Sequence, residues 1–310
     1  MSAEGGADHA VRVTVVVPFL DPGRFFREAV ESVLAQEGCD WELLLVDDGS
    51  RPEEGAVARE YARRDPSRVR VLEHPGHANR GRSAARNLGL AEARGEYTAF
   101  LDADDVWLPG KLALQAAVLD RHPDVPMLCG RAEWWWSWSG EPEDAERDFV
   151  QRWSVPLDTV VPPPAVLRMY LDDEWASPCD IMVRTRDARA LGGWVESFGG
   201  MYDDQAFHAK ICLDRPVYVS APVGYRYRQH GESCTSRAHA AGSAWWARGV
   251  FLEWLDAYLG EPGRDRDGLR RRVRRELFRR RHLRLWKAAE AVRRFAGGGA
   301  RPAAGKEKRP

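Results

Sequence analysis

The feature that most constrains this chain is a regular alternation of short apolar strands with amphipathic helical segments over its first 130 residues. A continuously apolar, β-branched run begins at Val11 (VRVTVVVPF), as expected of a strand that is buried on both faces. The next segment, RFFREAVESVLAQ, spaces its apolar residues as a helix does. Further strands are predicted from Trp41, Arg68 and Glu96, with helical segments between them. This alternation predicts right-handed crossovers and a mostly parallel α/β sheet that is flanked by helices.

The pattern loosens beyond Gly140, after a predicted strand VPMLCGRAEWWWSW. We predict a Pro-led helix within VPLDTVVPPPAVLRMYLDD, strands in CDIMVRT and PVYVSAPVGYRYRQH, and a helix, DDQAFHAKICLD, between these two strands. The chain then turns helical from Ala238 to about Phe295. We therefore divide it into a disordered N-terminus (1–10), two halves of one α/β domain (11–130 and 131–235), a helical extension (236–296) and a disordered tail (297–310).

The charge distribution is balanced overall but uneven along the chain. A formal net charge of -1 gives no global attraction to nucleic acid or membranes. From Arg264, however, the chain is densely basic, with an apolar stripe of Leu269, Val273, Leu277, Leu283 and Trp286. This helix could pack its stripe on the protein and leave its arginines solvated, or it could lie on an anionic membrane. Nucleic-acid binding is not predicted, because no recognised reading module accompanies the arginines.

The cysteines and the N-terminus indicate the compartment. The five cysteines are scattered, odd in number and without a CxxC pair, which argues against a disulfide framework and against a structural zinc site. The N-terminus MSAEGGADHA is polar and lacks an apolar signal core, and no run approaches the roughly 18 to 20 apolar residues that span a bilayer. We expect a cytoplasmic protein, at most peripheral at the inner face of the membrane.

Acidic residues follow the predicted strands at the points where those strands end. Asp102, Asp104 and Asp105 follow the fourth strand, residues 47–50 follow the second, and residues 18–21 follow the first. Ligands of such sheets bind at the carboxyl ends of the strands, so these positions should converge on one crevice. Asp is also favoured in turns and helix caps, but two acidic clusters at one edge are hard to attribute to capping alone. The DxD spacing from Asp102 suits a hard cation such as Mg²⁺ or Mn²⁺, which prefers oxygen ligands.

Two further motifs each allow a structural and a functional interpretation. Asp48 and Ser50, in VDDGS, suit a turn closed by glycine, or hydrogen bonds to a nucleobase or ribose. Asp203 and Asp204 open a helix after a glycine-rich loop, as caps or as a displayed general base whose pKa the neighbouring carboxylate raises. The chain has neither a GxxxxGK[ST] loop nor a strand-following GxGxxG.

Several motifs in a fixed order resemble family 2 glycosyltransferases of the GT-A fold, over roughly residues 11 to 233. They are VVVPF with its following Asp21, ELLLVDDGS, NRGRSAARNLGL with GEYTAFLDADD, YDDQAFHAKI, and YRYRQHGES. The resemblance implies a Rossmann-like mixed sheet and an inverting enzyme that uses Mn²⁺ or Mg²⁺ and a nucleotide-diphosphate sugar, such as a UDP-, GDP- or dTDP-sugar. Residues 11–130 would bind this donor, and residues 131–235 would bind the acceptor.

The resemblance also implies a role for individual residues. Those implied to bind the donor are Pro18, Phe19, Asp21, Asp48, Ser50, Arg86 and Asp102. Asp104 would be the chief metal ligand, with Asp102 facing the ribose or metal. His230 would lie near the diphosphate or metal, although a lone histidine is as often structural.

The acidic pair of the family maps to Asp203 and Asp204, and it makes Asp204 the candidate base. Asp203 replaces the usual Glu, so the choice between the two carboxylates stays open. The QxxRW signature of processive polysaccharide synthases is absent, which argues against a processive enzyme.

The acceptor class stays open between a polysaccharide, a lipid-linked molecule and a small molecule, and membrane contact through the basic helix would suit the second. The tryptophans of EWWWSW, Trp134, Trp135, Trp136 and Trp138, are either core or a platform for a sugar ring. A non-catalytic nucleotide- or carbohydrate-binding relative is one alternative function. A sugar-phosphate nucleotidyltransferase is another, but it would be expected to carry a glycine-rich, Arg-containing loop after its first strand. Aromatic residues on the C-terminal helices are compatible with a homodimer.

Overall fold

The computed structural model describes residues 11–282, which fall into two units that divide between Arg248 and Gly249. The expectations of disorder for residues 1–10 and 297–310, and of a helix over 283–296 that includes Leu283 and Trp286, lie outside the described residues.

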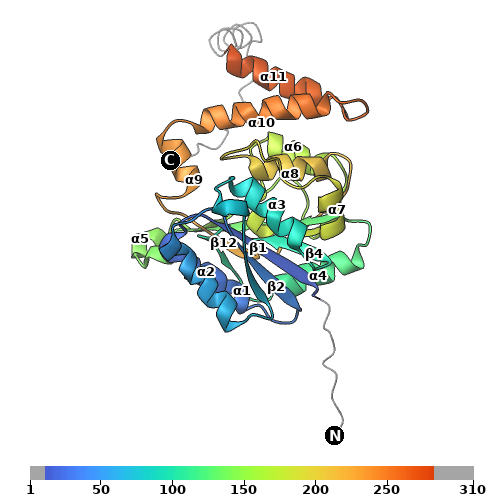
Figure 1. Cartoon of the computed structure of the whole chain (residues 1–310). Helices are drawn as coiled ribbons and strands as arrows, with labels where there is room; N and C mark the ends of the chain where they lie inside the picture. Colours follow the sequence, from blue (N-terminus) through green and yellow to red (C-terminus); the bar gives the residue numbers. More distant parts are fainter. Residues whose placement is uncertain (1–10, 283–310) are drawn as a thin grey trace, which may run out of the picture. The chain divides into compact units, whose positions relative to one another are not determined.

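The first unit is built on an eight-stranded sheet with the order β3-β2-β1-β4-β10-β6-β11-β9 (Figure 1). The strands are β1 (Val13–Phe19), β2 (Trp41–Asp47), β3 (Val69–Glu73), β4 (Tyr97–Phe100), β6 (Met127–Cys129), β9 (Thr159–Val161), β10 (Ile181–Arg184) and β11 (Val217–Val219). Strands β1 to β4 pair in parallel, whereas β10 runs antiparallel between β4 and β6. The prediction of a mostly parallel mixed α/β sheet flanked by helices is confirmed.

Four helices connect and cover the first strands: α1 (Phe26–Leu34), α2 (Pro52–Arg64), α3 (Arg82–Glu92) and α4 (Lys111–Arg121). Every residue of β1 is buried, which explains its continuously apolar sequence. Because side chains alternate across a strand, Val15 joins the core that contains residues of α1 and α4, while Val16 faces α3. The α3 backbone approaches β1 at Gly89 so closely that a Cβ there would overlap the Val16 side chain.

The segment predicted as one strand from Val125 to Trp138 is two strands in two different sheets. Strand β6 belongs to the large sheet, and β7 (Ala132–Trp135) belongs to a second sheet with the order β5-β12-β7-β8. The other members are β5 (Val106–Trp107), β8 (Phe149–Val150) and β12 (Tyr225–Arg228). The chain changes sheet at Gly130, where the carboxylate of Asp180 leaves no room for a side chain. The apolar pattern hid this change because both strands carry apolar residues.

The second half of the unit holds shorter helices: α5 (Pro142–Ala145), α6 (Ala165–Leu171), α7 (Thr185–Ala190) and α8 (Asp203–Cys212). The Pro-led helix is α6, which follows a cis peptide bond between Pro163 and Pro164. Helix α7 was not predicted, because TRDARA carries no apolar period. Helix α8 begins at the predicted acidic pair and contacts α6.

The C-terminal part of the described chain is helical, with α9 (Cys234–Ala240), α10 (Ala244–Leu259) and α11 (Leu269–Arg281). Within the second unit, Arg270 and Arg274 of α11 pair with Asp256 of α10 at 3.0 and 2.8 Å. No helix within residues 11–282 is both long enough and apolar enough to cross a membrane.

Candidate active site

A cavity of about 550 Å³ opens where β1 and β4 end. Its walls come from the loop after β1, the loop after β4, the start of α3, and the segment that follows β12. They include Pro18, Phe19, Asp21, Asp102, Asp104 and His230, all of which the sequence analysis proposed as site residues. The fold therefore brings together residues that lie more than a hundred positions apart, such as Asp104 and His230.

Asp48 and Ser50 lie behind this wall and do not line the cavity. Both are buried. The carboxylate of Asp48 accepts hydrogen bonds from the backbone N–H groups of Arg80 (2.8 Å) and Gly81 (2.9 Å), and the Ser50 hydroxyl accepts one from the N–H of Asp21 (3.0 Å). These two side chains hold the loops on either side of the cavity, and their contact with a nucleotide remains a prediction.

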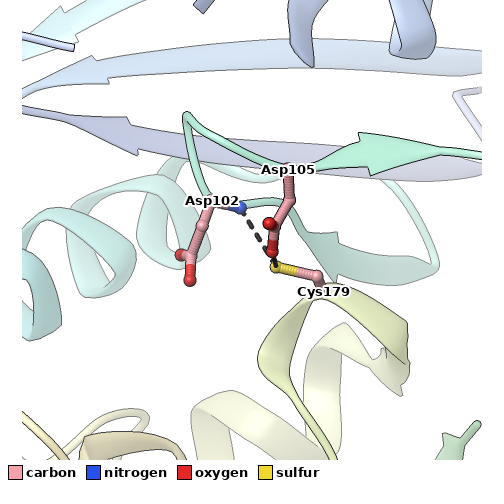
Figure 2. A group of neighbouring side chains, drawn as sticks. All are labelled: Asp102, Asp105 and Cys179. Atoms are coloured by element: carbon pink, nitrogen blue, oxygen red, sulfur yellow. Dashed lines mark hydrogen bonds between the residues drawn. The ribbon is translucent and has the colours of Figure 1, made fainter. Parts of the chain in front are cut away.

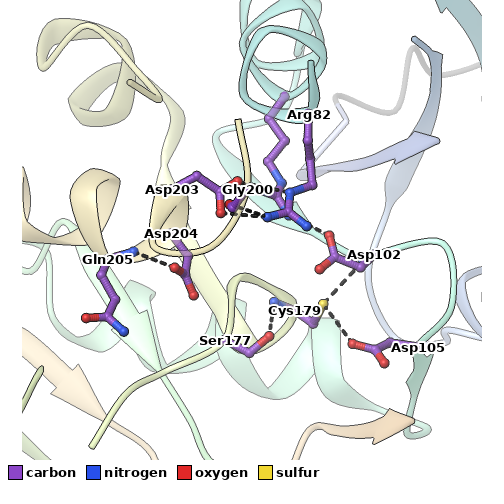
Figure 3. A network of polar contacts seen from close by, with 10 residues as sticks. Arg82, Asp102, Asp105, Ser177, Cys179, Gly200, Asp203, Asp204 and Gln205 are labelled. Atoms are coloured by element: carbon purple, nitrogen blue, oxygen red, sulfur yellow. Dashed lines mark hydrogen bonds and ion pairs between the residues drawn. The ribbon is translucent and has the colours of Figure 1, made fainter. Parts of the chain in front are cut away.

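A network of two arginines and two carboxylates joins α3 to the start of α8 and to the end of β4 (Figure 3). Arg82 donates to both oxygens of Asp203, at 3.0 and 2.7 Å. Arg86 donates to Asp203 at 2.6 Å and to Asp102 at 2.5 Å. Its guanidinium is fully buried and stacks on the ring of Trp194 at 4.3 Å. Arg86 thus fixes Asp102 and Asp203 in place without lining the cavity itself.

The two members of the acidic pair have different surroundings. Burial alone would raise the pKa of Asp203, but the charges and hydrogen bonds of Arg82 and Arg86 outweigh burial and hold this pKa below its usual value. Asp204 has no arginine partner, and its carboxylate accepts one hydrogen bond within the described chain, from the N–H of Gln205 at 2.7 Å (Figure 3). Burial, and then the charge of Asp203, raise the pKa of Asp204 to about 7. Asp203 is therefore a structural anion, and Asp204 is a carboxylate that can take up a proton near neutral pH.

Asp104 and His230 form a pair at the wall of the cavity. The Nε2 atom of His230 lies 3.0 Å from Oδ2 of Asp104, and the ring packs edge-on against Phe25. The Asp104 side chain is 35% exposed, and within residues 11–282 it pairs with neither a lysine nor an arginine. The Nδ1 atom of His230 is buried without a hydrogen-bond partner there.

The residue types of this wall suit a hard divalent cation. Two carboxylates, Asp102 and Asp104, offer the oxygen ligands that Mg²⁺ and Mn²⁺ prefer, and His230 adds an imidazole nitrogen. Asp102 already accepts from Arg86, and within residues 11–282 these three side chains do not bring their ligand atoms within 4.8 Å of one another. A cation would also compensate the charge of Asp104, whose side chain has His230 as its one basic partner in the described part of the chain.

A second acidic group, Asp102, Asp105 and Cys179, places its ligand atoms within 4.8 Å of one another (Figure 2). Its atoms already have partners: Asp105 accepts from the N–H of Arg228 at 2.9 Å and from the Cys179 thiol at 3.3 Å, and that sulfur accepts from the N–H of Asp102. Burial raises the pKa of the Cys179 thiol well above its usual value, which opposes the thiolate that a metal would need. This group ties the loop after β4 to β12, a role that the sequence did not reveal.

The sequence analysis missed many residues of the cavity wall, among them Arg24, Arg82 and Tyr227. For Arg82 a signal existed, because it precedes Arg86 by four positions and so lies on the same face of a helix. Arg24 and Tyr227 carried no comparable signal, since their positions depend on the packing of the loop after β1 against β12.

The predicted tryptophan cluster is half-buried throughout, and the rings of Trp134 and Trp136 stack with their centroids 5.9 Å apart. Trp134 stacks on Phe149, with ring centroids 5.4 Å apart. Trp136 and Trp138 line a second cavity, of about 590 Å³, which shares Arg24, His230 and Glu232 with the first. The Nε1–H of Trp138 donates to the carbonyl of Gln229 at 2.8 Å, which fixes that ring.

Comparison with known proteins places the chain in a family. Residues 14–172 match the model of glycosyl transferase family 2, which is half of the chain. The chain therefore belongs to glycosyl transferase family 2, and the predicted family is confirmed.

Among curated relatives, the uncharacterized glycosyltransferase YibD of Escherichia coli (strain K12) is 29% identical over 75% of this chain and 65% of that protein. The uncharacterized glycosyltransferase EpsJ of Bacillus subtilis (strain 168) is 42% identical over 30% of this chain and 26% of that protein. The chain spans only part of the length of several curated relatives: between 13% and 31% of y4gI of Sinorhizobium fredii, EpsJ and alr2836 of Nostoc.

Solved structures share the fold. S. aureus TarS (residues 1–349), in complex with UDP-GlcNAc, has a TM-score of 0.62 at 20% identity, over 87% of this chain and 72% of that one. The mannosyltransferase PcManGT from Pyrobaculum calidifontis, in complex with GDP-Man and Mn²⁺, has a TM-score of 0.61 at 20% identity, over 95% and 78% of the two chains. At this identity the likeness establishes the fold, which agrees with the predicted GT-A architecture.

Proposed function

We propose that this chain is a metal-dependent, inverting glycosyltransferase that moves a sugar from a nucleotide-diphosphate donor to an acceptor hydroxyl. The observation that carries this proposal is the difference in surroundings between Asp203 and Asp204. Two arginines neutralise Asp203, while the Asp204 carboxylate pairs with no basic side chain among residues 11–282 and has a pKa raised to about 7. A general base is most effective when its pKa lies near the working pH.

The donor is assigned to the 550 Å³ cavity. Pro18, Phe19 and Asp21 supply its nucleotide wall, and Asp48 and Ser50 hold the loops on either side. The complexes of TarS with UDP-GlcNAc and of PcManGT with GDP-Man support a nucleotide-sugar donor. The Mn²⁺ in the second of these supports a divalent metal, which Asp104, Asp102 and His230 would hold here. When bound, such an ion supplies positive charge for the departing diphosphate.

The proton transfer is assigned to Asp204. Its carboxylate accepts the proton of the acceptor hydroxyl while that oxygen attacks the anomeric carbon from the face opposite the diphosphate. The new bond joins the acceptor oxygen to the sugar, the bond to the phosphate oxygen breaks, and one displacement inverts the anomeric configuration. Arg82 and Arg86 keep Asp203 ionised beside Asp204, and burial together with that negative charge raises the pKa of Asp204 to about 7.

A carbohydrate acceptor is supported by the second cavity. The half-buried indole rings of Trp136 and Trp138 line it, and such rings offer apolar faces on which a sugar ring can stack. The cavity adjoins the donor cavity through Arg24, His230 and Glu232. Asp204 lines neither this cavity nor the donor cavity, so we propose the second cavity for the part of the acceptor that lies away from the reacting hydroxyl. Experiment distinguishes the polysaccharide, lipid-linked and small-molecule classes of acceptor.

The test is a thermal-shift and donor-hydrolysis screen over UDP-, GDP- and dTDP-sugars, with and without Mn²⁺. We expect one nucleotide class to stabilise the wild type and Asp204→Asn in the presence of Mn²⁺, and to stabilise Asp104→Asn much less. Hydrolysis should be lost in both variants and kept in Asp124→Asn, a control at an exposed carboxylate.

Absence of stabilisation by every donor would overturn the proposal. Stabilisation without turnover by the wild type, over a broad acceptor panel, would favour the non-catalytic binding alternative.

A further inference from the structure

Helix α11 has two faces of opposite character. It contains eight arginines and one glutamate in thirteen residues, LRRRVRRELFRRR. Leu269, Val273 and Leu277 are buried and recur at the spacing of one helical face. The ion pairs of Arg270 and Arg274 with Asp256 and of Arg281 with Glu253 hold the helix to α10. The apolar stripe is therefore already covered, and it leaves the opposite face exposed.

The exposed face carries three arginines without an acidic partner. Arg271, Arg275 and Arg279 are spaced four residues apart, so they lie along one side of the helix. All three are exposed, and within residues 11–282 none of them forms an ion pair. The positive charges of these three side chains are therefore free to contact an anionic partner.

An exposed aromatic ring lies within this basic face. Phe278 is 52% exposed, although it is among the most apolar residue types. Its position, three residues after Arg275 and one before Arg279, places it on the same side of the helix as the three arginines. A solvated helix gains nothing from an exposed phenylalanine there, and phosphate contacts to nucleic acid need only the arginines. Arginines around an aromatic residue are the combination found on helices that lie in a membrane interface.

We propose that the face of α11 formed by Arg271, Arg275, Phe278 and Arg279 docks on a lipid bilayer with anionic headgroups. The guanidinium groups would contact the headgroup phosphates, and the Phe278 ring would enter the boundary between headgroups and acyl chains. Charge complementarity selects anionic over neutral lipid. The proposal does not depend on the donor site or on catalysis.

The test is co-sedimentation of the full chain with vesicles of phosphatidylcholine alone or with phosphatidylglycerol. We expect sedimentation with the anionic vesicles, at least tenfold weaker partitioning in Arg271→Gln/Arg275→Gln/Arg279→Gln, and a several-fold loss in Phe278→Ala that Phe278→Trp restores. Raising the salt from 50 to 500 mM should release the wild type, because headgroup attraction is screened. The matched control is Arg63→Gln/Arg121→Gln/Arg186→Gln, which loses the same charge from exposed positions outside α11 and should sediment like the wild type.

Circular dichroism and the melting temperature show whether the variants stay folded, and the salt dependence of the wild type needs no variant. Sedimentation that is equal for the α11 triple variant and its control, or equal with neutral and anionic vesicles, would overturn the proposal. So would failure to sediment with any vesicle. If the protein binds a labelled DNA duplex at 150 mM salt and does not bind the vesicles, the proposal is overturned in favour of a nucleic-acid partner.

Discussion

Asp203 and Asp204 are neighbours in sequence, yet the structure sets their pKa values apart. Figure 3 shows Asp203 pointing toward Arg82 and Asp204 turned toward Gln205. Asp203 also pairs with Arg86, whereas Asp204 is buried and has no arginine partner among the described residues, so its pKa is raised. Two carboxylates that are adjacent in sequence are therefore no longer equivalent once the helix is placed. Of the two carboxylates, only Asp204 has the properties of a base at neutral pH.

The rate of sugar transfer should depend on the ionisation of Asp204. With a pKa of about 7, the carboxylate is protonated and inactive at pH 5.5 and ionised at pH 8.5. We expect kcat to rise with pH through about 7 and to fall about 10²-fold or more in Asp204→Asn at every pH. A pH series of initial rates measures this, and a flat profile for the wild type would contradict the assignment.

The stability of the protein should respond to the same residue with the opposite sign. The folded pKa of Asp204 lies above its usual value, so the folded state binds the extra proton and loses stability as pH rises toward and through 7. Asp204→Asn removes this loss. We therefore expect the variant to melt at a higher temperature than the wild type at pH 8, with a smaller gain at pH 5. Thermal melts at both pH values measure the gain, and an equal gain at the two values would count against a raised pKa.

At the scale of elements, the contact between α3 and α8 positions the proposed base, Asp204. Arg82 and Arg86 occupy successive turns of α3 and both reach Asp203, the first residue of α8. Arg86 is fully buried and Arg82 is 35% exposed at the side chain. Removing a partner from a buried charge pair is costlier than from an exposed one, so the two arginines should differ in their structural importance.

Arg82→Gln should shift the midpoint of the kcat–pH profile and should change the free energy of unfolding only slightly. The charge of Arg82 lowers the pKa of Asp204, so its removal should move the midpoint of the kcat profile to higher pH, and Arg82→Lys should restore it. Arg86→Gln, in contrast, should lower the free energy of unfolding by about 3–5 kcal/mol. Rate profiles and urea denaturation measure the two effects. An unshifted profile in Arg82→Gln would show that this arginine is structural only.

The contact of α3 with β1 depends on a residue without a side chain. A Cβ at Gly89 would overlap Val16, which is fully buried in the sheet. We expect Gly89→Ala to lower the free energy of unfolding by about 1–3 kcal/mol, as overpacking does. Gly199→Ala is the control, because no atom lies within 4 Å of a Cβ there. Equal urea midpoints for the two variants would show that α3 can move away from the sheet.

At the scale of the whole molecule, the five cysteines lie in different parts of the fold and differ in their exposure to solvent. All are free thiols: Cys129, Cys179 and Cys212 are buried, Cys39 is partly buried, and Cys234 is exposed. They lie in the large sheet, in the loops beside it and in α8 and α9.

Thiol labelling should follow this distribution. We expect Ellman's reagent to modify Cys234 first, Cys39 more slowly and the other three only on unfolding. Because Cys234 lines the donor cavity, a bound nucleotide sugar should slow its modification. Cys234→Ser identifies the fast phase. Donor binding that leaves the fast phase unchanged would place the donor elsewhere.

The elements of this protein could largely be predicted from the sequence, because the period of apolar residues is a local property of the chain. The same is true of the acidic strand ends, since the carboxyl ends of parallel strands meet at one edge of the sheet. Pro18, Phe19, Asp21, Asp102 and Asp104 were found in this way and His230 through the resemblance to the family, and all six line one cavity.

Only the tertiary structure decided which of these groups are charged, covered or exposed. Arg82 meets Asp203 across 121 positions, and that contact depends on how α3 and α8 are rotated about their axes. Asp48 and Ser50 turned out to support loops behind the cavity, and the strand from Val125 divided between two sheets at Gly130. A sequence pattern fixes the face on which a residue lies within its own element, but the pKa and the partners of that residue are set by elements that arrive from elsewhere in the chain.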